Sequence, residues 1–342
     1  MIEPKSDVNL QELNTLAIAS TAQYFIEVYS AEELVNAHQW ALARDLQLTI
    51  LGGGSNLVLN QYVPGLVVHI AIAGIRILAD GDDWMVLEVG AGEIWHQFIL
   101  KALAMGLSGI ENLSLIPGTT GAAPVQNIGA YGVELKDCFL GLTAFDRTES
   151  QWQAFTRDDC QFSYRDSIFK QYAGRYLITQ VRFKLPKKFN PSLDYGPLAE
   201  LKTQLDTLTP KLVSDKVCEI RQQKLPNPKD IPNAGSFFKN PVITNQHYQH
   251  LLDVYPDLVA YKVDDGYKLA AGWLIDHAGF KGYRDPDTGV GMHDKQALVL
   301  VNPDRAAAHD VLHLVAIIQQ KIADMYQVKL EIEPVQLGEL RP

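Results

Sequence analysis

The sequence predicts a protein of mixed α and β structure that is divided into two or three domains. Its 342 residues exceed the length of most single domains. Hydrophobic residues make up 47% of the chain and charged residues 20%, a balance that is typical of globular domains with real cores. Buried-strand patterns and helical patterns alternate along the first third of the chain, which indicates mixed secondary structure.

The first third opens with a helix and a strand that leads into a glycine turn. The sequence from Ser30 to Glu33 is typical of a capping box, and the apolar stripe behind it predicts a helix to about Leu46. A short buried strand is expected over 48–51, and it leads into a glycine turn at 52–56. These glycines allow positive φ and close approach of backbone N–H groups to a ligand. Further strands are predicted at 65–71, 75–79 and 84–89, and a helix at 95–105.

The middle of the chain contains a second glycine-rich segment, from Ile116 to Gly132. It is neither charged nor serine-rich enough for a linker. Its small residues are typical either of backbone that lies against a large flat ligand or of an irregular packed loop. Strands are predicted at 142–147 and 176–185, and the polar, proline-bearing stretch 186–197 is a candidate domain boundary or flap.

The C-terminal part is predicted to contain helices at 211–222, 269–277 and 305–326 and a buried strand at 297–301. Residues 328–333 alternate with period two, so we expect a strand with Leu330 and Ile332 inward. Glu331 and Glu333 then share the other face. A proline follows directly and marks an edge or a strand end.

The charge balance limits the possible partners. Lys and Arg total 30 against 40 Asp and Glu, a formal net charge of -10 that argues against nucleic acid and against anionic membranes. An anionic substrate then needs local cations. Arg221, Lys224, Lys229 and Lys239 form a candidate basic island, which could equally be a solvated face.

The cysteines and the N-terminus indicate a cytoplasmic protein. Cys138, Cys160 and Cys218 show no CxxC spacing, which fits a reducing compartment. The first residues lack the layout of a signal peptide, and no apolar run approaches the roughly 18 residues that span a bilayer.

Common catalytic motifs are absent from the sequence. Neither glycine-rich segment completes the dinucleotide fingerprint G-x-G-x-x-G, and there is no Walker A sequence. The nine histidines show no HExxH pattern, so no metal site is predicted and His277 and His293 are interpreted as ordinary polar residues. Ser236, in the segment 233–241 (NAGSFFKNP), lacks a nucleophile elbow. Its mixture of aromatic, amide and cationic neighbours nevertheless makes it the best candidate for chemistry.

Several segments occur together and in order, and their combination is far more specific than any one of them. They are Asn14-Thr15, 51–57, 117–132, 164–170 (YRDSIFK), 224–226 (KLP), 233–241, 271–276 (AGWLID) and the glutamate-bearing segment near the C-terminus. By these segments the chain resembles the UDP-N-acetylenolpyruvoylglucosamine reductases, flavoenzymes that complete UDP-N-acetylmuramate in bacterial cell-wall synthesis. The resemblance covers nearly the whole chain.

The resemblance implies a fold and a domain order. We expect an α+β protein with an FAD-binding fold of the vanillyl-alcohol-oxidase (PCMH) type and a smaller α+β substrate-binding domain at the C-terminus. The implied domains are 1–70 and 71–222, two FAD-binding subdomains with the Tyr195 loop in the second, and 223–342, whose last strand returns Glu333 to the active site. A monomer is expected.

The resemblance also implies a reaction and three catalytic residues. NADPH would reduce non-covalently bound FAD, whose N5 would then deliver hydride to C3 of the enolpyruvyl group of UDP-N-acetyl-enolpyruvoylglucosamine. Ser236 matches the proton donor to C2. Arg165 matches the arginine that stabilises the substrate carboxylate, although it could instead pair with Asp166.

Glu333 matches the third catalytic residue. Pro334 follows this glutamate, which departs from the family's pattern, and Glu331 stays an alternative because it lies on the same face of the expected strand. Whichever acid serves would need to be protonated or hydrogen-bonded beside the substrate carboxylate, which requires a raised pKa.

Binding residues follow from the same resemblance. Those implied to contact FAD are Gly52, Gly53, Gly54, Ser55, Asn56, Leu57, Gly118, Thr119, Thr120, Gly121, Ala122, Pro124, Gln126, Asn127, Gly129, Ala130, Tyr131 and Gly132. Those implied to contact the sugar nucleotide are Tyr164, Tyr195, Lys224, Asn240, Tyr261, Lys281 and Gln296. Tyr195 lies in a stretch similar to the mobile loop of one subclass, although on its own it is equally typical of a turn residue that packs locally.

Two other functions remain open. An FAD-linked oxidase of the same fold would be indicated by a flavin-linking His or Cys, and the segment from Pro117 to Gly132 has neither. A non-catalytic module that binds a sugar nucleotide or stores flavin would show no turnover.

Overall fold

The computed structural model describes residues 2–339. It divides into two compact units, and each is described by itself. Unit 1 consists of Met1–Val8, Ala22–Gly53 and Pro64–Arg221, and unit 2 of Asn9–Thr21, Gly54–Val63 and Gln222–Pro342. Unit 2 therefore draws two short segments from the N-terminal part of the chain. The domain bounds expected from the sequence stay predictions.

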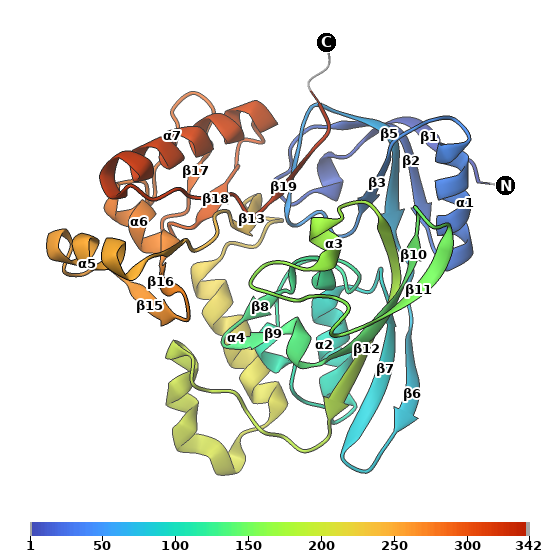
Figure 1. The fold of residues 1–342 in the computed structure, drawn as a ribbon, viewed down its shortest axis with the longest axis horizontal. Helices are drawn as coiled ribbons and strands as arrows, with labels where there is room; N and C mark the ends of the chain where they lie inside the picture. Colours follow the sequence, from blue (N-terminus) through green and yellow to red (C-terminus); the bar gives the residue numbers. More distant parts are fainter. Residues whose placement is uncertain (1, 340–342) are drawn as a thin grey trace. The chain divides into compact units, whose positions relative to one another are not determined.

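A four-stranded sheet and helix α1 begin unit 1 (Figure 1). The strand order is β1-β2-β5-β3, with bounds β1 (Lys5–Asn9), β2 (Thr21–Val28), β5 (Tyr62–Ile70) and β3 (Leu48–Leu51). Helix α1 (Ala31–Leu42) is capped as predicted by Ser30, whose side chain accepts a hydrogen bond from Glu33 N at 3.1 Å. The helix ends at Leu42 and not near Leu46, because Asp45 adopts left-handed backbone with φ 53°.

The second sheet of unit 1 is antiparallel and five-stranded, in the order β11-β10-β12-β7-β6. Its strands are β11 (Gln151–Thr156), β10 (Phe139–Asp146), β12 (Tyr176–Pro186), β7 (Trp84–Gly90) and β6 (Ile75–Asp80). Helix α2 (Trp95–Ala104) packs against it through Phe98, whose ring centroid lies 4.8 Å from that of Phe183 on β12. Every strand and helix predicted before residue 186 is found, and β11 is an additional strand.

Short elements complete unit 1. Between the sheets' strands lie the 3-10 helices η2 (Glu111–Leu113), η3 (Ala123–Gln126) and η4 (Leu135–Asp137), the hairpin β8 (Gly129–Ala130) and β9 (Val133–Glu134), and helix α3 (Ile168–Gln171). Residues 187–195 form a loop that leads to η5 (Gly196–Thr207) and then to α4 (Pro210–Lys224). A small separate core under this loop contains Leu193, Leu198, Leu208, Val213, Val217 and Ile220.

The described residues of unit 2 form three small sheets, three α-helices and one 3-10 helix. The sheets are β13-β18-β17, β14-β16-β15 and the parallel pair β19-β4. The strands are β4 (Leu57–Leu59), β13 (Asn233–Ser236), β14 (Val242–Ile243), β15 (Ala260–Val263), β16 (Gly266–Leu269), β17 (Gly291–Met292), β18 (Val299–Val301) and β19 (Val335–Leu337). The helices are η1 (Gln11–Leu13), α5 (Asn245–Val254), α6 (Ala271–His277) and α7 (Ala308–Tyr326). The predicted helices and the buried strand of this part are found with slightly different bounds.

The strand predicted at 328–333 is wrong. Residues 328–333 form no strand, and only Ile332 makes an isolated bridge, to Phe238. The regular strand starts after Pro334, as β19, and pairs in parallel with β4. Glu331 is exposed whereas Glu333 is 9% exposed, so the two carboxylates do not share a face as expected. Residues 331–333 make two backbone hydrogen bonds to residues 237–239. This pairing is too short to make their side chains alternate between two faces, as they do in a regular strand.

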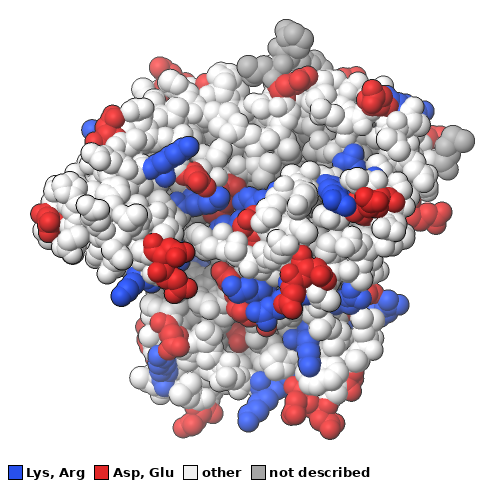
Figure 2. All heavy atoms as spheres, in the orientation of Figure 1, with Lys and Arg blue, Asp and Glu red and all other residues white. Residues whose placement is uncertain are grey.

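Three further observations concern the expectations on partners and compartment. On the face drawn in Figure 2, Lys and Arg side chains are interspersed with Asp and Glu. Cys138, Cys160 and Cys218 are free thiols. Within residues 2–339, no helix is long and apolar enough to cross a membrane, and no group of three or more His, Cys, Asp or Glu side chains is arranged to hold a metal ion.

Asn302 fastens an N-terminal segment into unit 2. Its side chain is fully buried, donates to Leu16 O and Ala306 O at 3.0 Å each, and accepts from Ala306 N at 2.8 Å. A second link joins Asn233 N to Thr15 O at 2.8 Å. Residues 9–21 therefore belong to the C-terminal unit through buried hydrogen bonds.

We expect Asn302→Ala to lower the free energy of unfolding by about 2 to 4 kcal/mol, because buried polar groups that lose their partners each cost about 1 to 3 kcal/mol. Urea unfolding followed by circular dichroism measures the change. Asn36→Ala, on the exposed face of α1, is the matched control and should change stability by less than about 0.5 kcal/mol. Equal effects of the two substitutions would contradict the role given to Asn302.

Candidate active site

Two glycine-rich segments of unit 1 lie against each other. A β-carbon on Gly53 would be 2.8 Å from Gly118 Cα, and one on Gly52 would be 2.8 Å from Thr119 Oγ1. The first contact is backbone against backbone, so a side chain at Gly53 would force the segments apart. Glycine backbone, which carries no side chains, can approach a diphosphate closely and donate hydrogen bonds from its N–H groups to it. The residues present therefore fit the pyrophosphate of a dinucleotide.

The remaining residues of the first glycine turn belong to unit 2. Gly54 has φ 60°, and a β-carbon there would be 1.9 Å from Leu13 O, so only glycine can occupy the position. Gly54 O also accepts a hydrogen bond from Thr15 N at 3.0 Å. Ser55 and Asn56 follow in the turn, and Leu57 begins β4. The predicted FAD-binding set is thus distributed over both units.

The glycine-rich segment 116–132 is held in an irregular conformation by buried polar side chains. Asn127 and Tyr131 have left-handed backbone, with φ 45° and 51°, a conformation that non-glycine residues adopt rarely and at a cost. Asn127 is fully buried, donates to Glu134 Oε2 at 2.9 Å and Ser163 O at 3.2 Å, and accepts from Lys136 N at 3.1 Å. Backbone strain of this kind is concentrated at functional sites.

His96 holds the residue that precedes this segment. Its Nδ1 accepts a hydrogen bond from Leu115 N at 3.0 Å, and Leu115 itself has φ 59°. Burial lowers the pKa of His96, and the charges of Arg221 and Lys211 lower it further. Both effects favour the neutral imidazole that this hydrogen bond requires.

Arg165 lies at the apex of a tight turn in unit 1. Ser163 and Asp166 form a bridge across the turn, and Arg165 has φ 56°. Its guanidinium donates to Gly129 O at 3.1 Å and lies over the Tyr164 ring, 5.6 Å from the centroid. The Asp166 carboxylate accepts from Gln171 Nε2 at 2.9 Å. Arg165 is therefore joined to the glycine-rich segment.

Ser236 is exposed at the end of β13, between a glycine with left-handed backbone and two core aromatics. Gly235 has φ 68°, and its N–H donates to Asn233 Oδ1 at 2.9 Å. Phe237 and Phe238 are 0% and 1% exposed and anchor the segment in the core of unit 2. The serine hydroxyl is thereby fixed at the surface, where a substrate can reach it.

A short antiparallel pairing places Glu333 opposite Phe237, the residue that follows this serine. Glu333 N donates to Phe237 O at 2.9 Å, and Lys239 N donates to Glu331 O at 2.9 Å. Glu331 is exposed and forms an ion pair with Lys239, Nζ to Oε2 at 3.0 Å. Of the two glutamates, Glu333 is therefore the buried one, and its backbone pairs with the residue that follows Ser236.

Unit 2 brings together some of the predicted substrate residues. Asn240 Oδ1 accepts from Ala271 N at 2.9 Å, and Gln296 Oε1 would be 3.1 Å from a β-carbon on Gly272, so both side chains meet the first turn of α6. Lys281 is exposed and pairs with Asp276 at 3.0 Å. Lys224, Tyr261, Tyr164 and Tyr195 are exposed.

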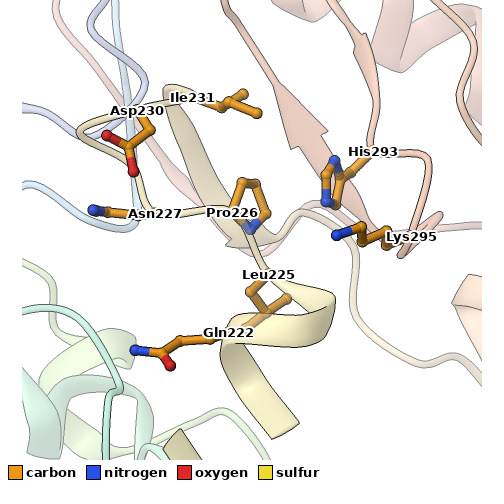
Figure 3. A pocket seen from close by; sticks show the side chains of 8 residues that line it. All are labelled: Gln222, Leu225, Pro226, Asn227, Asp230, Ile231, His293 and Lys295. Carbon is orange, nitrogen blue, oxygen red and sulfur yellow. The ribbon is translucent and has the colours of Figure 1, made fainter. Parts of the chain in front are cut away.

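Unit 2 contains a cavity of about 200 Å³ (Figure 3). Two of its lining residues, Leu225 and Lys295, are sequence neighbours of Lys224 and Gln296. One of its walls is His293, 7% exposed, whose Nδ1 is 3.1 Å from Asp294 Oδ1. Burial lowers the pKa of His293, and the Asp294 carboxylate opposes this effect. The lining residues are Gln222, Leu225, Pro226, Asn227, Asp230, Ile231, His293 and Lys295. This cavity was not predicted from the sequence, because its residues come from distant segments.

Comparison with protein families defines the class of this protein. Residues 22–153 match the family model described as FAD binding domain, and residues 227–337 match the model described as UDP-N-acetylenolpyruvoylglucosamine reductase, C-terminal domain. The chain is therefore an FAD-binding oxidoreductase with the vanillyl-alcohol-oxidase type of fold and an α+β C-terminal domain, as predicted.

Individual relatives identify the family. The UDP-N-acetylenolpyruvoylglucosamine reductase of Pseudomonas fluorescens (strain Pf0-1) is 48% identical over 97% of this chain and 98% of its own length. The reductase of the same name from Chromobacterium violaceum is 47% identical over 97% of this chain and 98% of its own. The crystal structure of the Thermus caldophilus reductase matches 99% of this chain and 100% of its own, with a TM-score of 0.68 and 26% identity. The chain belongs to the UDP-N-acetylenolpyruvoylglucosamine reductase family. This membership confirms the predicted FAD-dependent reductase of peptidoglycan precursor synthesis over the oxidase and the non-catalytic module.

We expect Gly53→Ala to weaken FAD retention strongly, because the new methyl group meets the Gly118 backbone. Gly52→Ala is the matched control: its methyl group meets the Thr119 hydroxyl, which can rotate away. The flavin absorbance per polypeptide after gel filtration measures retention, and thermal unfolding verifies that both variants fold. Full flavin content in Gly53→Ala would contradict the close approach of the two segments.

Proposed function

We propose that this protein catalyses the NADPH-dependent reduction of UDP-N-acetyl-enolpyruvoylglucosamine to UDP-N-acetylmuramate, with Ser236 as the proton donor. The observation that carries the proposal is the backbone pairing of the buried Glu333 with Phe237, the residue that follows the exposed Ser236. Membership of the reductase family supplies the reaction, and the local geometry supports the roles of the residues.

The cofactor assignment is supported by the bare backbone at Gly53 and Gly118 and by the matched FAD-binding domain. When bound and reduced by NADPH, FAD supplies the hydride that adds to C3 of the enolpyruvyl group. The first glycine turn and the segment 118–132 would hold its diphosphate and ring system through backbone N–H groups.

Ser236 would complete the reduction at C2. Addition of hydride to C3 leaves carbanionic charge at C2, which spreads into the adjacent carboxylate. Such a centre is basic enough to take a proton from a serine hydroxyl, even though serine is a weak acid. The conformation of Gly235 and the buried Phe237 would fix the hydroxyl in one place and avoid the cost of ordering it during the reaction.

Arg165 and Glu333 are proposed to act on the substrate carboxylate. A guanidinium held by Gly129 O and by the Tyr164 ring would stabilise the second negative charge that gathers there. The buried carboxyl group of Glu333 would hydrogen-bond the same carboxylate. Glu331 is the weaker candidate, because it is exposed and already forms an ion pair with Lys239.

Seven polar and aromatic residues would hold the sugar nucleotide. The proposed contacts are Tyr164, Tyr195, Lys224, Asn240, Tyr261, Lys281 and Gln296. Exposed cations and aromatic rings suit a uridine diphosphate, and Asn240 and Gln296 next to the first turn of α6 offer amide groups. A monomeric state and a cytoplasmic location are part of the same proposal.

We expect Ser236→Ala to leave the reduction of bound FAD by NADPH unchanged and to lower turnover by roughly 10² to 10⁴, or about 3 to 5 kcal/mol of barrier. Stopped-flow absorbance separates the two half-reactions. Unchanged turnover would remove Ser236 from the mechanism.

We expect Glu333→Gln and Glu331→Gln to differ in kcat. The first should lower kcat by at least about tenfold, as loss of a group that acts on the reacting substrate does. The second, which removes only an exposed ion pair, should leave kcat within about twofold. Steady-state assays of the two matched variants measure this, and the reverse order would assign the role to Glu331.

A further inference from the structure

One buried side chain of unit 1 donates hydrogen bonds to two separate segments. Asn112, in η2, is 1% exposed, and its Nδ2 donates to Tyr131 O and to Ser192 O, each at 2.9 Å. An amide group has two N–H protons, so these two acceptors use both. Sequence reasoning assigned Asn112 no role, and the proposed chemistry does not use it.

The two acceptors belong to segments with different proposed ligands. Tyr131 and Gly132 end the glycine-rich segment that is proposed to hold FAD. Ser192 lies three residues before Tyr195, which is proposed to cover the sugar nucleotide. Asn112 therefore joins the cofactor side of unit 1 to the substrate loop.

The same segments also touch each other directly. The rings of Tyr131 and Tyr195 meet edge to face, with centroids 5.6 Å apart and an interplanar angle of 82°. A β-carbon on Gly132 would lie 3.7 Å from Ser192 Oγ and 3.8 Å from Tyr195 Cβ, which is ordinary contact distance. Tyr131 also packs against the small core that contains Leu193. The Tyr195 loop therefore rests on the turn at Tyr131, and Asn112 bonds to both.

An ion pair near Tyr195 is a weaker constraint on the loop. Asp194 pairs with Lys202 at 2.7 Å, and both side chains are exposed. Exposed ion pairs contribute little, whereas a buried amide that satisfies two backbone carbonyls is costly to remove, because both carbonyls lose their partner. Asn112 is thus the stronger constraint.

We propose that Asn112 is a positioning residue that couples the Tyr131–Gly132 turn to the Tyr195 loop. The coupling rests on the proposed function, in which FAD lies against the first segment and the sugar nucleotide beneath the second. When the loop closes over the substrate, Asn112 keeps it in a defined position relative to the segment that holds the flavin. Asn112 makes no contact with either ligand in this account and acts through Tyr131 and Tyr195.

Loss of the Asn112 amide should affect the half-reaction with the sugar nucleotide and not the reduction of FAD by NADPH. In the FAD-loaded protein we expect Asn112→Ala to raise the KM for the enolpyruvyl sugar nucleotide about tenfold, the size expected for losing a buried hydrogen-bond donor. The rate of flavin reduction by NADPH should change by less than about twofold. Asn112→Asp, which has nearly the same shape but no N–H donor when ionised, should behave like the alanine variant.

Ser214→Ala is the matched control. It removes the buried hydrogen bond between Ser114 Oγ and Ser214 Oγ, 2.7 Å, which joins the residue after η2 to α4 without touching Tyr131 or Ser192. We expect an unchanged KM for the control. A KM that rises equally in Ser214→Ala would indicate general loosening of unit 1 and overturn the proposal.

A double-mutant cycle with Tyr195→Ala tests whether Asn112 acts through the loop. The effect of Asn112→Ala on KM should largely vanish in the Tyr195→Ala background, because contacting residues couple in this way and independent ones do not. Additive effects would overturn the proposal.

Hydrogen exchange tests the coupling in the wild-type protein and does not depend on activity. Adding UDP-N-acetylmuramate to the FAD-loaded wild type should slow exchange of residues 188–197 and of residues 128–133 together. Protection of only one segment would contradict the coupling, even if the Asn112 variants fail to fold. If the wild type binds FAD but does not reduce the enolpyruvyl substrate, the proposed function fails instead.

Discussion

The chemistry proposed for this protein depends on one short backbone pairing in unit 2. Glu333 N donates to Phe237 O, and Lys239 N donates to Glu331 O, each at 2.9 Å. These two hydrogen bonds set the register of two segments almost a hundred residues apart in the sequence. Because of that register, the buried Glu333 pairs with the residue that follows the exposed Ser236, and Glu331 is directed to solvent, where it meets Lys239.

The proposed cofactor site in unit 1 depends on a different constraint, which is the close approach of two glycine-rich segments. Gly53 lies so close to the Gly118 backbone that it tolerates no side chain. Left-handed residues such as Asn127 and Tyr131 then give the segment 116–132 a shape that is costly in isolation. Buried amides offset that cost: Asn127 bonds to its own hairpin and Asn112 to Tyr131 O. The cofactor-binding backbone is therefore shaped by polar side chains behind it.

Much of the fold could be predicted from the sequence, because periodicity reports which faces are buried. Helices α2, α4, α6 and α7 and strands β3, β5, β6, β7, β10 and β12 follow from it, whereas β2, a central strand of the first sheet, was not predicted. Strand β11 was missed because it is an edge strand with mostly exposed, polar residues. The segment 328–333 was wrongly predicted, since its alternation is that of a strand but its pairing stops at a single bridge. The site residues came from resemblance to a family. Asn112, Asn233 and Asn302 were not found, because a single buried amide leaves no periodic signal.

The central claim is that this chain passes electrons from NADPH through FAD to an enolpyruvyl sugar nucleotide. The most direct measurement is a visible absorbance spectrum of the FAD-loaded protein under anaerobic conditions, first with NADPH and then with UDP-N-acetyl-enolpyruvoylglucosamine. The account predicts that NADPH bleaches the flavin and that the enolpyruvyl substrate restores the oxidised spectrum with formation of UDP-N-acetylmuramate. A protein that takes up no FAD, or a reduced flavin that the substrate cannot reoxidise, would contradict it.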